Sequence, residues 1–243
     1  MKISGSTVLV TGANRGLGAA FTRALLDRGA RTVYAGARDP ASASVTATGT
    51  GTGTGQDLIP VALDITDPGS VAAAAARCAD VDLLINNAGI SLSRSPGPDR
   101  ARAEMETNYF GTLSMSRAFA PVLAGNGGGA LVNVLSVLSF VTFPPVSTYA
   151  ASKAAAWSLT NALRVELAEQ GTQVVGVHAG YIDTDMAAGV EGPKISPAEV
   201  AGLTLDGLEA GAYEVLADGI SRETKAALSG DLELLYPALA TRR

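Results

Sequence analysis

Several features are scarce in this chain of 243 residues, and each absence excludes something. The chain has one cysteine, Cys78, so no disulfide can form within it, and we interpret Cys78 as a small core residue of an Ala-rich helix. No apolar run reaches the roughly 18 residues that a membrane-spanning helix needs. The N-terminus lacks the regions of a signal peptide. We therefore expect a cytoplasmic protein without a membrane partner.

Charged residues are also few, at 17%, and the formal net charge is −5. An acidic surface repels phosphate backbones, so we expect no nucleic-acid partner. The hydrophobic content of 47% is typical of a globular protein. The chain has one histidine, His178, which we interpret as structural, and we expect no metal site.

Short apolar runs alternate with helical patterns along the chain. Strands are expected at 7–10, 32–35, 59–63, 81–85, 130–134, 173–177 and 213–216, and helices at 16–28, 67–79, 100–124, 149–169, 197–208 and 222–228. Strands without polar alternation are typical of a parallel sheet covered on both faces. The sequence therefore predicts an α/β fold: a single domain over 1–243, with a doubly wound parallel sheet of Rossmann-like dinucleotide-binding topology.

Two regions interrupt this alternation. In the tract at 46–55, Thr and Gly alternate, which predicts a shortened crossover helix followed by a loop. The pattern also weakens after Met186. There we expect a substrate lid at about 187–212 and an atypical C-terminal tail at 222–243.

A glycine-rich turn joins the first expected strand to the first helix. Glycines allow a tight turn and let backbone N–H groups approach a pyrophosphate at the helix N-terminus. The expected nucleotide-binding residues of this turn are Gly12, Asn14, Arg15, Gly16, Leu17 and Gly18. Asp64 and the run from Asn87 to Gly89 follow later strands at the edge where such folds bind ligands, although either alone is compatible with ordinary turn chemistry.

Tyr149 and Lys153 lie four residues apart on an expected helix, so they share a face. A cation about 4 Å from a phenol lowers its pKa by roughly three units, which makes tyrosine a usable acid/base. Lysine is rare in this chain, so one placed a turn after a tyrosine favours this interpretation. The alternative is a solvated lysine beside a packed tyrosine.

Two further polar residues are candidates for the same site. Ser136 closes the fifth expected strand, where its hydroxyl can hold a substrate carbonyl; Ser139 and Ser147 are rivals that fall within the following loop. Asn108 lies inside an expected helix, where asparagine is unfavourable. This indicates that its side chain points into the protein and has a polar role there. The alternative for Asn108 is a hydrogen bond that bends the helix.

Together these motifs resemble the short-chain dehydrogenase/reductase family from Lys2 to about Met186. Four motifs occur in the family's order: Thr11 to Gly18, Asn86 to Gly89, Ser136, and Tyr149 to Lys153. The resemblance implies that Tyr149 is the general acid/base and that Lys153 lowers its pKa and holds the nicotinamide ribose. It also implies that Ser136 orients the substrate and that Asn108 supports a proton relay through water.

The resemblance extends to the cofactor. It implies that Asp64 and Ile65 line the adenine pocket, that Asn87, Ala88 and Gly89 flank the ribose, and that Ile182 and Thr184 grip the carboxamide. The chain departs from the family at Ala179-Gly180, where a Pro-Gly pair is usual, at Leu135, where a serine is usual, and in its C-terminal tail.

The end of the second expected strand predicts NADPH in preference to NADH. Enzymes of this fold that use NAD usually carry a carboxylate there, but this chain has Ala37 followed by Arg38. Arg38 and Arg15 suit a 2′-phosphate, because guanidinium groups bind phosphate oxygens strongly. Asp39 is the competing feature, since a strand that ended two residues later would favour NAD.

The leading hypothesis is an NADPH-dependent carbonyl reductase acting on a ketone, aldehyde or 3-oxoacyl group, or catalysing the reverse reaction. The alternatives are an NADP(H)-binding sensor or scaffold with little turnover, and an epimerase or dehydratase. We expect an apolar or aromatic carbonyl substrate. The candidate pocket residues are Leu92, Leu138, Phe140, Phe143, Val146, Tyr181 and Met186.

We also expect a homodimer or homotetramer. The resemblance implies that the helices beginning near Arg100 and Tyr149 pair between subunits across a two-fold axis. The apolar side chains expected to supply this interface are Phe110, Leu113, Phe119, Trp157 and Leu163.

Overall fold

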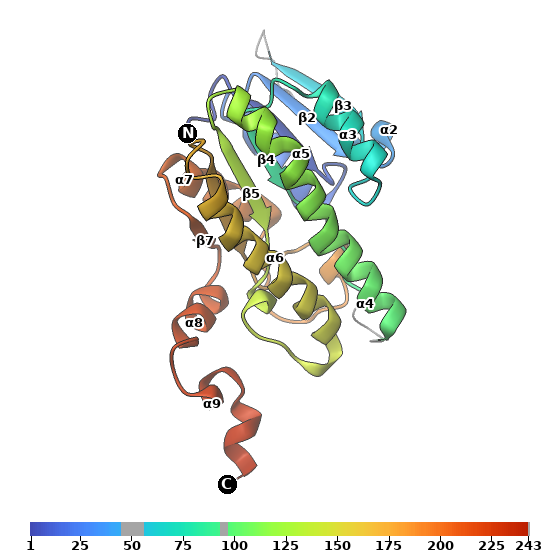
Figure 1. Ribbon diagram of the computed structural model, residues 1–243. Coiled ribbons are helices and arrows are strands. Elements are labelled where there is room, and N and C mark those ends of the chain that lie inside the picture. The colour runs from blue at the N-terminus through green and yellow to red at the C-terminus, as the bar shows by residue number, and fades with distance from the viewer. Residues whose placement is uncertain (45–55, 93–96, 243) are drawn as a thin grey trace.

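The structure is a computed structural model that describes residues 1–44, 56–92 and 97–242. Its centre is a parallel sheet of seven strands in the order β3-β2-β1-β4-β5-β6-β7 (Figure 1). The strands are β1 (Thr7–Thr11), β2 (Thr32–Ala37), β3 (Asp57–Ala62), β4 (Leu83–Asn86), β5 (Ala130–Val134), β6 (Gln173–His178) and β7 (Glu214–Leu216). The predicted α/β, doubly wound, Rossmann-like fold is confirmed.

Helices cover both faces of the sheet (Figure 1). One face carries α1 (Gly16–Asp27) and α7 (Pro197–Glu209), and the other carries α3 (Pro68–Arg77), α5 (Thr112–Gly125) and α6 (Ser147–Glu166). Phe21 is fully buried in the first layer, and Phe119 and Leu163 are fully buried in the second. Burying each such side chain stabilises the fold by about 1.5–3 kcal/mol.

The helix expected at 100–124 is divided in the structure. Helix α4 (Pro98–Met105) leads into a π-helical segment, Glu106–Gly111, which continues as α5. A π segment inside an α-helix often marks a functional site. This one contains Asn108, whose side chain is buried.

The structure describes the segment after Met186 but not the Thr/Gly tract, the two regions where the sequence pattern is irregular. In the described part of the crossover after β2 there is one short helix, α2 (Pro40–Ser44), and the Thr/Gly tract lies outside the described residues. The region expected to form a lid, at about 187–212, contains helix α7, which agrees with the helix expected at 197–208 and packs its buried face, including Val200 and Leu205, against α1. The lid itself remains a prediction.

The C-terminal tail extends away from the body of the molecule (Figure 1). It contains α8 (Gly219–Ala227), α9 (Leu232–Leu235) and a 3-10 segment, Pro237–Arg242. Only the first of these was expected from the sequence. No helix in the described part of the chain is both long and apolar enough to cross a membrane.

Candidate active site

The carboxyl ends of β1 and β4 meet where the strand order reverses, which is where doubly wound sheets bind ligands. The Thr11 hydroxyl accepts hydrogen bonds from the backbone N–H groups of Asn87 (3.0 Å) and Ala88 (2.9 Å). The Asn87 amide donates to the carbonyls of Thr11 (2.9 Å) and Gly12 (3.3 Å). These bonds tie the glycine loop to the loop after β4.

The glycine loop is shaped for close approach of backbone atoms. Gly12 and Gly16 have positive φ angles of 64° and 52°, which other residues rarely adopt. A Cβ atom on Gly18 would lie 2.1 Å from the Gly12 carbonyl oxygen. Helix α1 begins at Gly16 without a side-chain cap, so its first N–H groups are available to an anion. This cradle fits the pyrophosphate of a dinucleotide.

The other predicted residues of the glycine loop have different positions. Leu17 is buried in the core beneath the loop, Asn14 is half-buried, and Arg15 is exposed. Thr184, from the loop after β6, lies against Gly16: its Cγ2 would be 3.2 Å from a Cβ there. Ile182 in the same loop forms an isolated bridge with Ile195.

Strand β2 ends at Ala37, as the sequence predicts. Arg38 follows and is exposed, whereas the Asp39 carboxylate accepts a hydrogen bond from the Ala41 N–H (3.0 Å) at the start of α2. Arg15 forms an exposed ion pair with Asp185, with Nη1 3.4 Å from Oδ2. Such surface pairs contribute little, so the Arg15 guanidinium is not firmly held.

The predicted adenine pocket lies beside the end of β3. The pKa of Asp64 is lowered by hydrogen bonds from Thr66 and, to a smaller extent, by the charge of Arg38. The Arg38 guanidinium and the Asp64 carboxylate therefore lie close enough for their charges to interact, on the same side of the site. Ile65 is buried, and its side chain lies against Gly111 of the π segment.

Tyr149 and Lys153 share the first turns of α6, with Nζ 5.8 Å from the phenol ring centre. The sequence argument expected Lys153 to lower the pKa of Tyr149, but in the structure that pKa is raised to about 12. Burial is the main cause; a hydrogen bond with the Ser136 hydroxyl opposes it, and the Glu104 charge adds to it. The Lys153 ammonium instead donates to the Val134 carbonyl (2.9 Å), and burial lowers its own pKa to about 8.

Ser136 is held at the end of β5 by its neighbours. Its hydroxyl accepts a hydrogen bond from the Leu138 N–H (3.1 Å), and its own N–H donates to the Ser139 hydroxyl (3.3 Å). Its carbonyl lies 3.0 Å from Nδ1 of His178. Ser139 is thus a partner of Ser136, whereas Ser147 is exposed at the start of α6.

Asn108 faces inward from the π segment and joins two loops. Its amide exchanges two 2.9 Å hydrogen bonds with the backbone of Ile90 and donates a third, also 2.9 Å, to the Ser152 hydroxyl. That hydroxyl donates to the Tyr149 carbonyl at 2.7 Å. A Cβ on Gly89 would lie 3.0 Å from Asn108 Oδ1 and 3.6 Å from Lys153 Nζ, so Gly89 leaves room where these groups meet.

Sequence reasoning missed Glu104 and did not anticipate the ring contacts of Phe140. Glu104 is fully buried one helical turn before Asn108, and that spacing was the signal that could have identified it. Phe140 was expected to line a pocket. It stacks on His178 with ring centres 4.2 Å apart and contacts the edge of Trp157. These contacts join residues far apart in sequence, which no local pattern reveals.

Most of the chain is similar to known proteins. Residues 6–194 match the family model described as short chain dehydrogenase. Dehydrogenase/reductase SDR family member 7B of Bos taurus is 33% identical over 196 residues, which cover 76% of this chain and 60% of the relative. The chain thus spans about 60% of the length of this relative and of its counterparts in Mus musculus and Rattus norvegicus.

Two solved structures extend the likeness to nearly the whole chain. A short chain dehydrogenase from Burkholderia cenocepacia J2315 in complex with NADP has a TM-score of 0.88 and 44% identity, covering 100% of this chain and 98% of that one. A short-chain dehydrogenase from Sphingobium yanoikuyae in complex with NADPH has a TM-score of 0.81 and 26% identity, covering 98% and 96%. The chain therefore belongs to the short-chain dehydrogenase/reductase family.

Proposed function

We propose that the chain is an NADPH-dependent oxidoreductase that reduces a carbonyl group to an alcohol, or catalyses the reverse reaction, with Tyr149 as the acid/base. One observation carries the proposal. Tyr149 and Lys153 from α6, Ser136 from the end of β5, and Asn108 from the π segment converge on the loop that closes the nucleotide cradle. A protein that only bound the cofactor would have no need of this set.

The proposed chemistry needs a proton at the substrate oxygen. When bound, the nicotinamide supplies the hydride, and Tyr149 gives its phenolic proton to the oxygen. The Ser136 hydroxyl orients that oxygen, and Lys153 holds the ribose. Asn108 fixes the backbone beneath Tyr149 through Ser152, and the proton relay through water remains its proposed role. The Tyr149 phenol is protonated near neutral pH, as a proton donor must be, but its raised pKa makes it a weaker acid than an ordinary tyrosine and opposes the transfer.

Three features support NADPH as the preferred cofactor. Strand β2 ends at Ala37, so no carboxylate occupies the position that binds a ribose 2′-hydroxyl in NAD enzymes. Arg38 follows directly and is exposed. The Asp39 carboxylate is engaged in capping α2, and the solved relatives carry NADP and NADPH.

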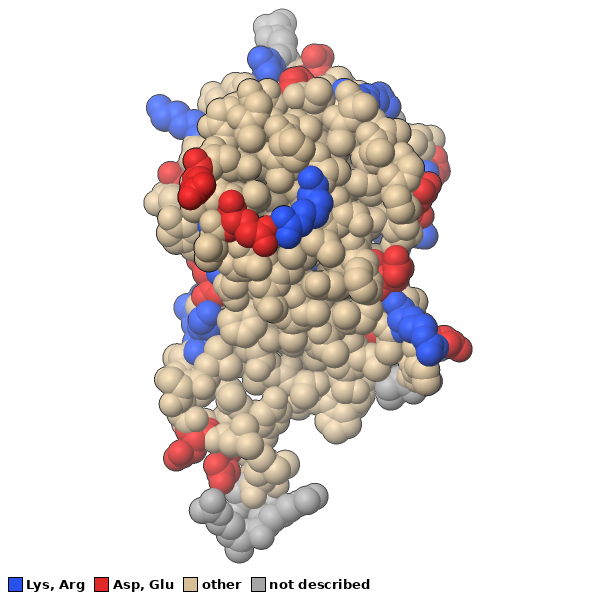
Figure 2. Space-filling view, in the orientation of Figure 1, with Lys and Arg blue, Asp and Glu red and all other residues tan. Residues whose placement is uncertain are grey.

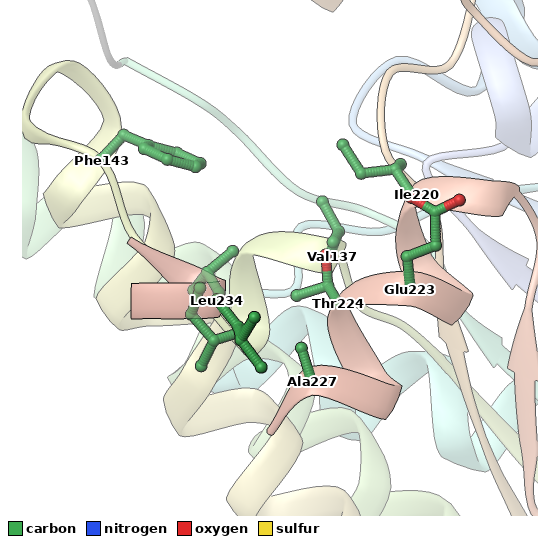
Figure 3. Close-up of a pocket in the computed structure, with 9 residues that line it drawn as sticks. Val137, Phe143, Ile220, Glu223, Thr224, Ala227 and Leu234 are labelled. Carbon is green, nitrogen blue, oxygen red and sulfur yellow. The ribbon is translucent and has the colours of Figure 1, made fainter. Parts of the chain in front are cut away.

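A cavity of about 200 Å³ beside the loop after Ser136 supports an apolar or aromatic substrate (Figure 3). Its lining residues are Val137, Val141, Phe143, Ile220, Glu223, Thr224, Ala227, Leu234 and Leu235. Most of these are apolar, although only Phe143 was among the pocket residues expected from the sequence. The atypical tail supplies much of the wall through α8 and α9, whereas Tyr181 and Met186 are exposed.

The test compares wild type with Tyr149→Phe, which removes only the phenolic hydroxyl. We measure NADPH oxidation against a panel of ketones, aldehydes and 3-oxoacyl thioesters, and NADPH binding by fluorescence. Turnover should fall by at least about a hundredfold in the variant while binding persists. Near-normal turnover in Tyr149→Phe would refute the mechanism. Binding by wild type without turnover on any member of the panel would favour the sensor.

A further inference from the structure

Lys225 lies on α8, in the C-terminal tail, and contacts three other elements of the fold. Its ammonium donates a hydrogen bond of 2.9 Å to the Glu214 carboxylate at the start of β7. The same ammonium lies 4.9 Å from the centre of the Phe140 ring and 5.1 Å from the centre of the Trp157 ring. Trp157 belongs to α6, and Phe140 directly follows the 3-10 segment Val137–Ser139. One cation thus joins α8 to β7, to α6 and to the loop after β5.

The groups around Lys225 lead back to Ser136. The Phe140 ring stacks on the His178 ring, with ring centres 4.2 Å apart, and His178 Nδ1 lies 3.0 Å from the Ser136 carbonyl. His178 Nε2 lies 3.6 Å from the Glu214 carboxylate that accepts a hydrogen bond from Lys225. These contacts form a closed ring, so the position of α8 is coupled to the end of β5, where the substrate-orienting hydroxyl is proposed to act.

Another side of α8 lines the cavity. Helix α8 packs against the 3-10 segment Val137–Ser139, and Thr224 and Ala227 of α8 share the cavity lining with Val137 (Figure 3). Any movement of α8 would therefore shift one wall of the cavity relative to the other. The side chains of Lys225 and Glu214 are 33% and 22% exposed, and a partly desolvated cation against aromatic rings is held more firmly than one in open solvent.

We propose that Lys225 is a positioning residue that holds α8 against the loop after Ser136 and thereby sets the shape of the substrate cavity. This inference rests on the proposed function, because it gives the tail a part in substrate choice. With α8 held in place, the cavity favours compact carbonyl substrates that fit between its two walls. Without the Lys225 ammonium, α8 opens more often, so the arrangement that binds a compact substrate is populated for less of the time and KM rises.

The decisive variant is Lys225→Met, which keeps an unbranched apolar side chain and removes the ammonium. Lys225→Arg is the conservative variant, since a guanidinium also pairs with a carboxylate and stacks on aromatic rings. The matched control is Lys2→Met, the same substitution at an exposed lysine near the N-terminus. Circular dichroism checks that each variant is folded.

The first measurement is the ratio of kcat/KM for two ketones that wild type reduces, one compact and one bulky and aromatic. Partial unfolding lowers both values by the same factor, so a merely structural defect leaves this ratio unchanged. In Lys225→Met we expect the ratio to move about three- to tenfold toward the bulky ketone, through a higher KM for the compact one. Lys225→Arg and Lys2→Met should keep the wild-type ratio.

The second measurement needs no substrate. Trp157 is the only tryptophan of the chain, so tryptophan fluorescence reports on this cluster alone. In Lys225→Met the emission should shift to longer wavelength, and acrylamide should quench it more strongly, because α8 then covers the ring for less of the time. Lys225→Arg and Lys2→Met should match wild type.

Both readouts must change in Lys225→Met and return in Lys225→Arg. A wild-type ratio or wild-type quenching in folded Lys225→Met overturns the proposal, and so does a Lys225→Arg variant that behaves like Lys225→Met. If wild type reduces no carbonyl of the panel while the Trp157 signals respond as expected, the proposed function fails and the hold of Lys225 on α8 stands. If wild type reduces the ketones but Lys225→Met changes neither readout, the inference about Lys225 fails alone.

Discussion

Lys153 shows how burial changes the pKa of a single side chain. Its folded-state pKa of about 8 lies below the ordinary value of 10.5, so the ammonium loses its proton as the pH rises through 8. The buried cation costs stability at low pH, and this cost disappears as the pH rises from about 8 to about 10.5. Its contact with the Val134 carbonyl offsets part of that cost.

The same titration predicts a pH dependence of cofactor binding. If Lys153 must be cationic to hold the ribose, the Kd for NADPH should rise by up to tenfold for each pH unit above about 8. The measurement is a fluorescence titration of the free protein between about pH 7 and pH 9.5. Lys153→Met should bind weakly with a flat profile over this range. An unchanged pH dependence in Lys153→Met would assign the titration to another group.

His178 illustrates a titratable residue that the proposed mechanism leaves aside. Burial lowers its pKa to about 4, so the imidazole is neutral at physiological pH. A neutral ring can donate from Nδ1 to the Ser136 carbonyl while Phe140 stacks on its face. The His178 ring therefore stabilises the backbone at the end of β5 through this hydrogen bond, which agrees with the structural role expected from the sequence.

Among the elements, the end of β2 carries the clearest prediction. Arg38→Ala removes the guanidinium proposed to bind the 2′-phosphate, and one such charge-assisted bond is worth about tenfold to a hundredfold in affinity. We expect kcat/KM for NADPH to fall by about that factor while kcat/KM for NADH is nearly unchanged. Arg102→Ala is the control, because Arg102 is an exposed arginine on α4 that pairs with Asp99.

The reciprocal substitution tests the same interpretation. Ala37→Asp places a carboxylate where NAD enzymes carry one and should shift the preference toward NADH. Because Ala37 is buried at the strand end, this variant also needs a thermal unfolding control. A wild-type preference for NADH would show that the reading of this strand end is wrong.

The π segment explains why one helix became two elements. The turn at Glu106–Gly111 directs the Asn108 amide toward Ile90 and Ser152. An α-helix continued through this stretch would change the direction of every side chain after it. The helical pattern in the sequence shows that the stretch is helical but does not reveal the wider turn.

At the scale of the whole molecule, we propose that residues 1–243 act as one domain. The sheet contains strands from both halves of the chain, and the cavity beside Ser136 is walled by α8 and α9 from the tail. The tail departs from the family pattern in sequence. We propose that its apolar side chains, such as Leu234, contact the substrate.

The expected oligomer interface needs a correction at the residue level. Phe119 and Leu163 are fully buried in this chain's own core, Leu113 packs against that core, and Trp157 contacts Phe140. Of the five side chains named from the sequence, Phe110 remains exposed, at 46%. Helical patterns could not distinguish the face that covers the sheet from the face that meets a partner.

The oligomer itself remains a prediction. The face over α5 and α6 carries few charged side chains (Figure 2), and Val165 on α6 is 77% exposed. The nearby Arg117 and Glu166 pair within the chain at 2.5 Å. We expect light scattering at micromolar concentration to give a dimer or tetramer, and Val165→Asp to shift the mass toward the monomer. Leu203→Asp, on α7 of the opposite layer, should leave the mass unchanged; a monomeric wild type would contradict the prediction.

The sequence by itself determined the framework of this protein. Short apolar runs such as Leu83 to Ile85 specify buried parallel strands, because only a sheet covered on both faces can bury them. The glycine loop from Thr11 to Gly18 and the four-residue spacing of Tyr149 and Lys153 are local features, and local patterns report local geometry. These features were enough to predict the fold, the family and the position of the candidate site.

Only the tertiary structure decided how the site's groups act on one another. The raised pKa of Tyr149, the bond from Lys153 to Val134 and the buried carboxylate of Glu104 each depend on contacts between segments far apart in the chain. Burial and charge at these positions arise when α4, α6 and the end of β5 pack together. A sequence names the groups, but their electrostatic balance is set by distances and solvent exclusion, which exist only in the folded molecule.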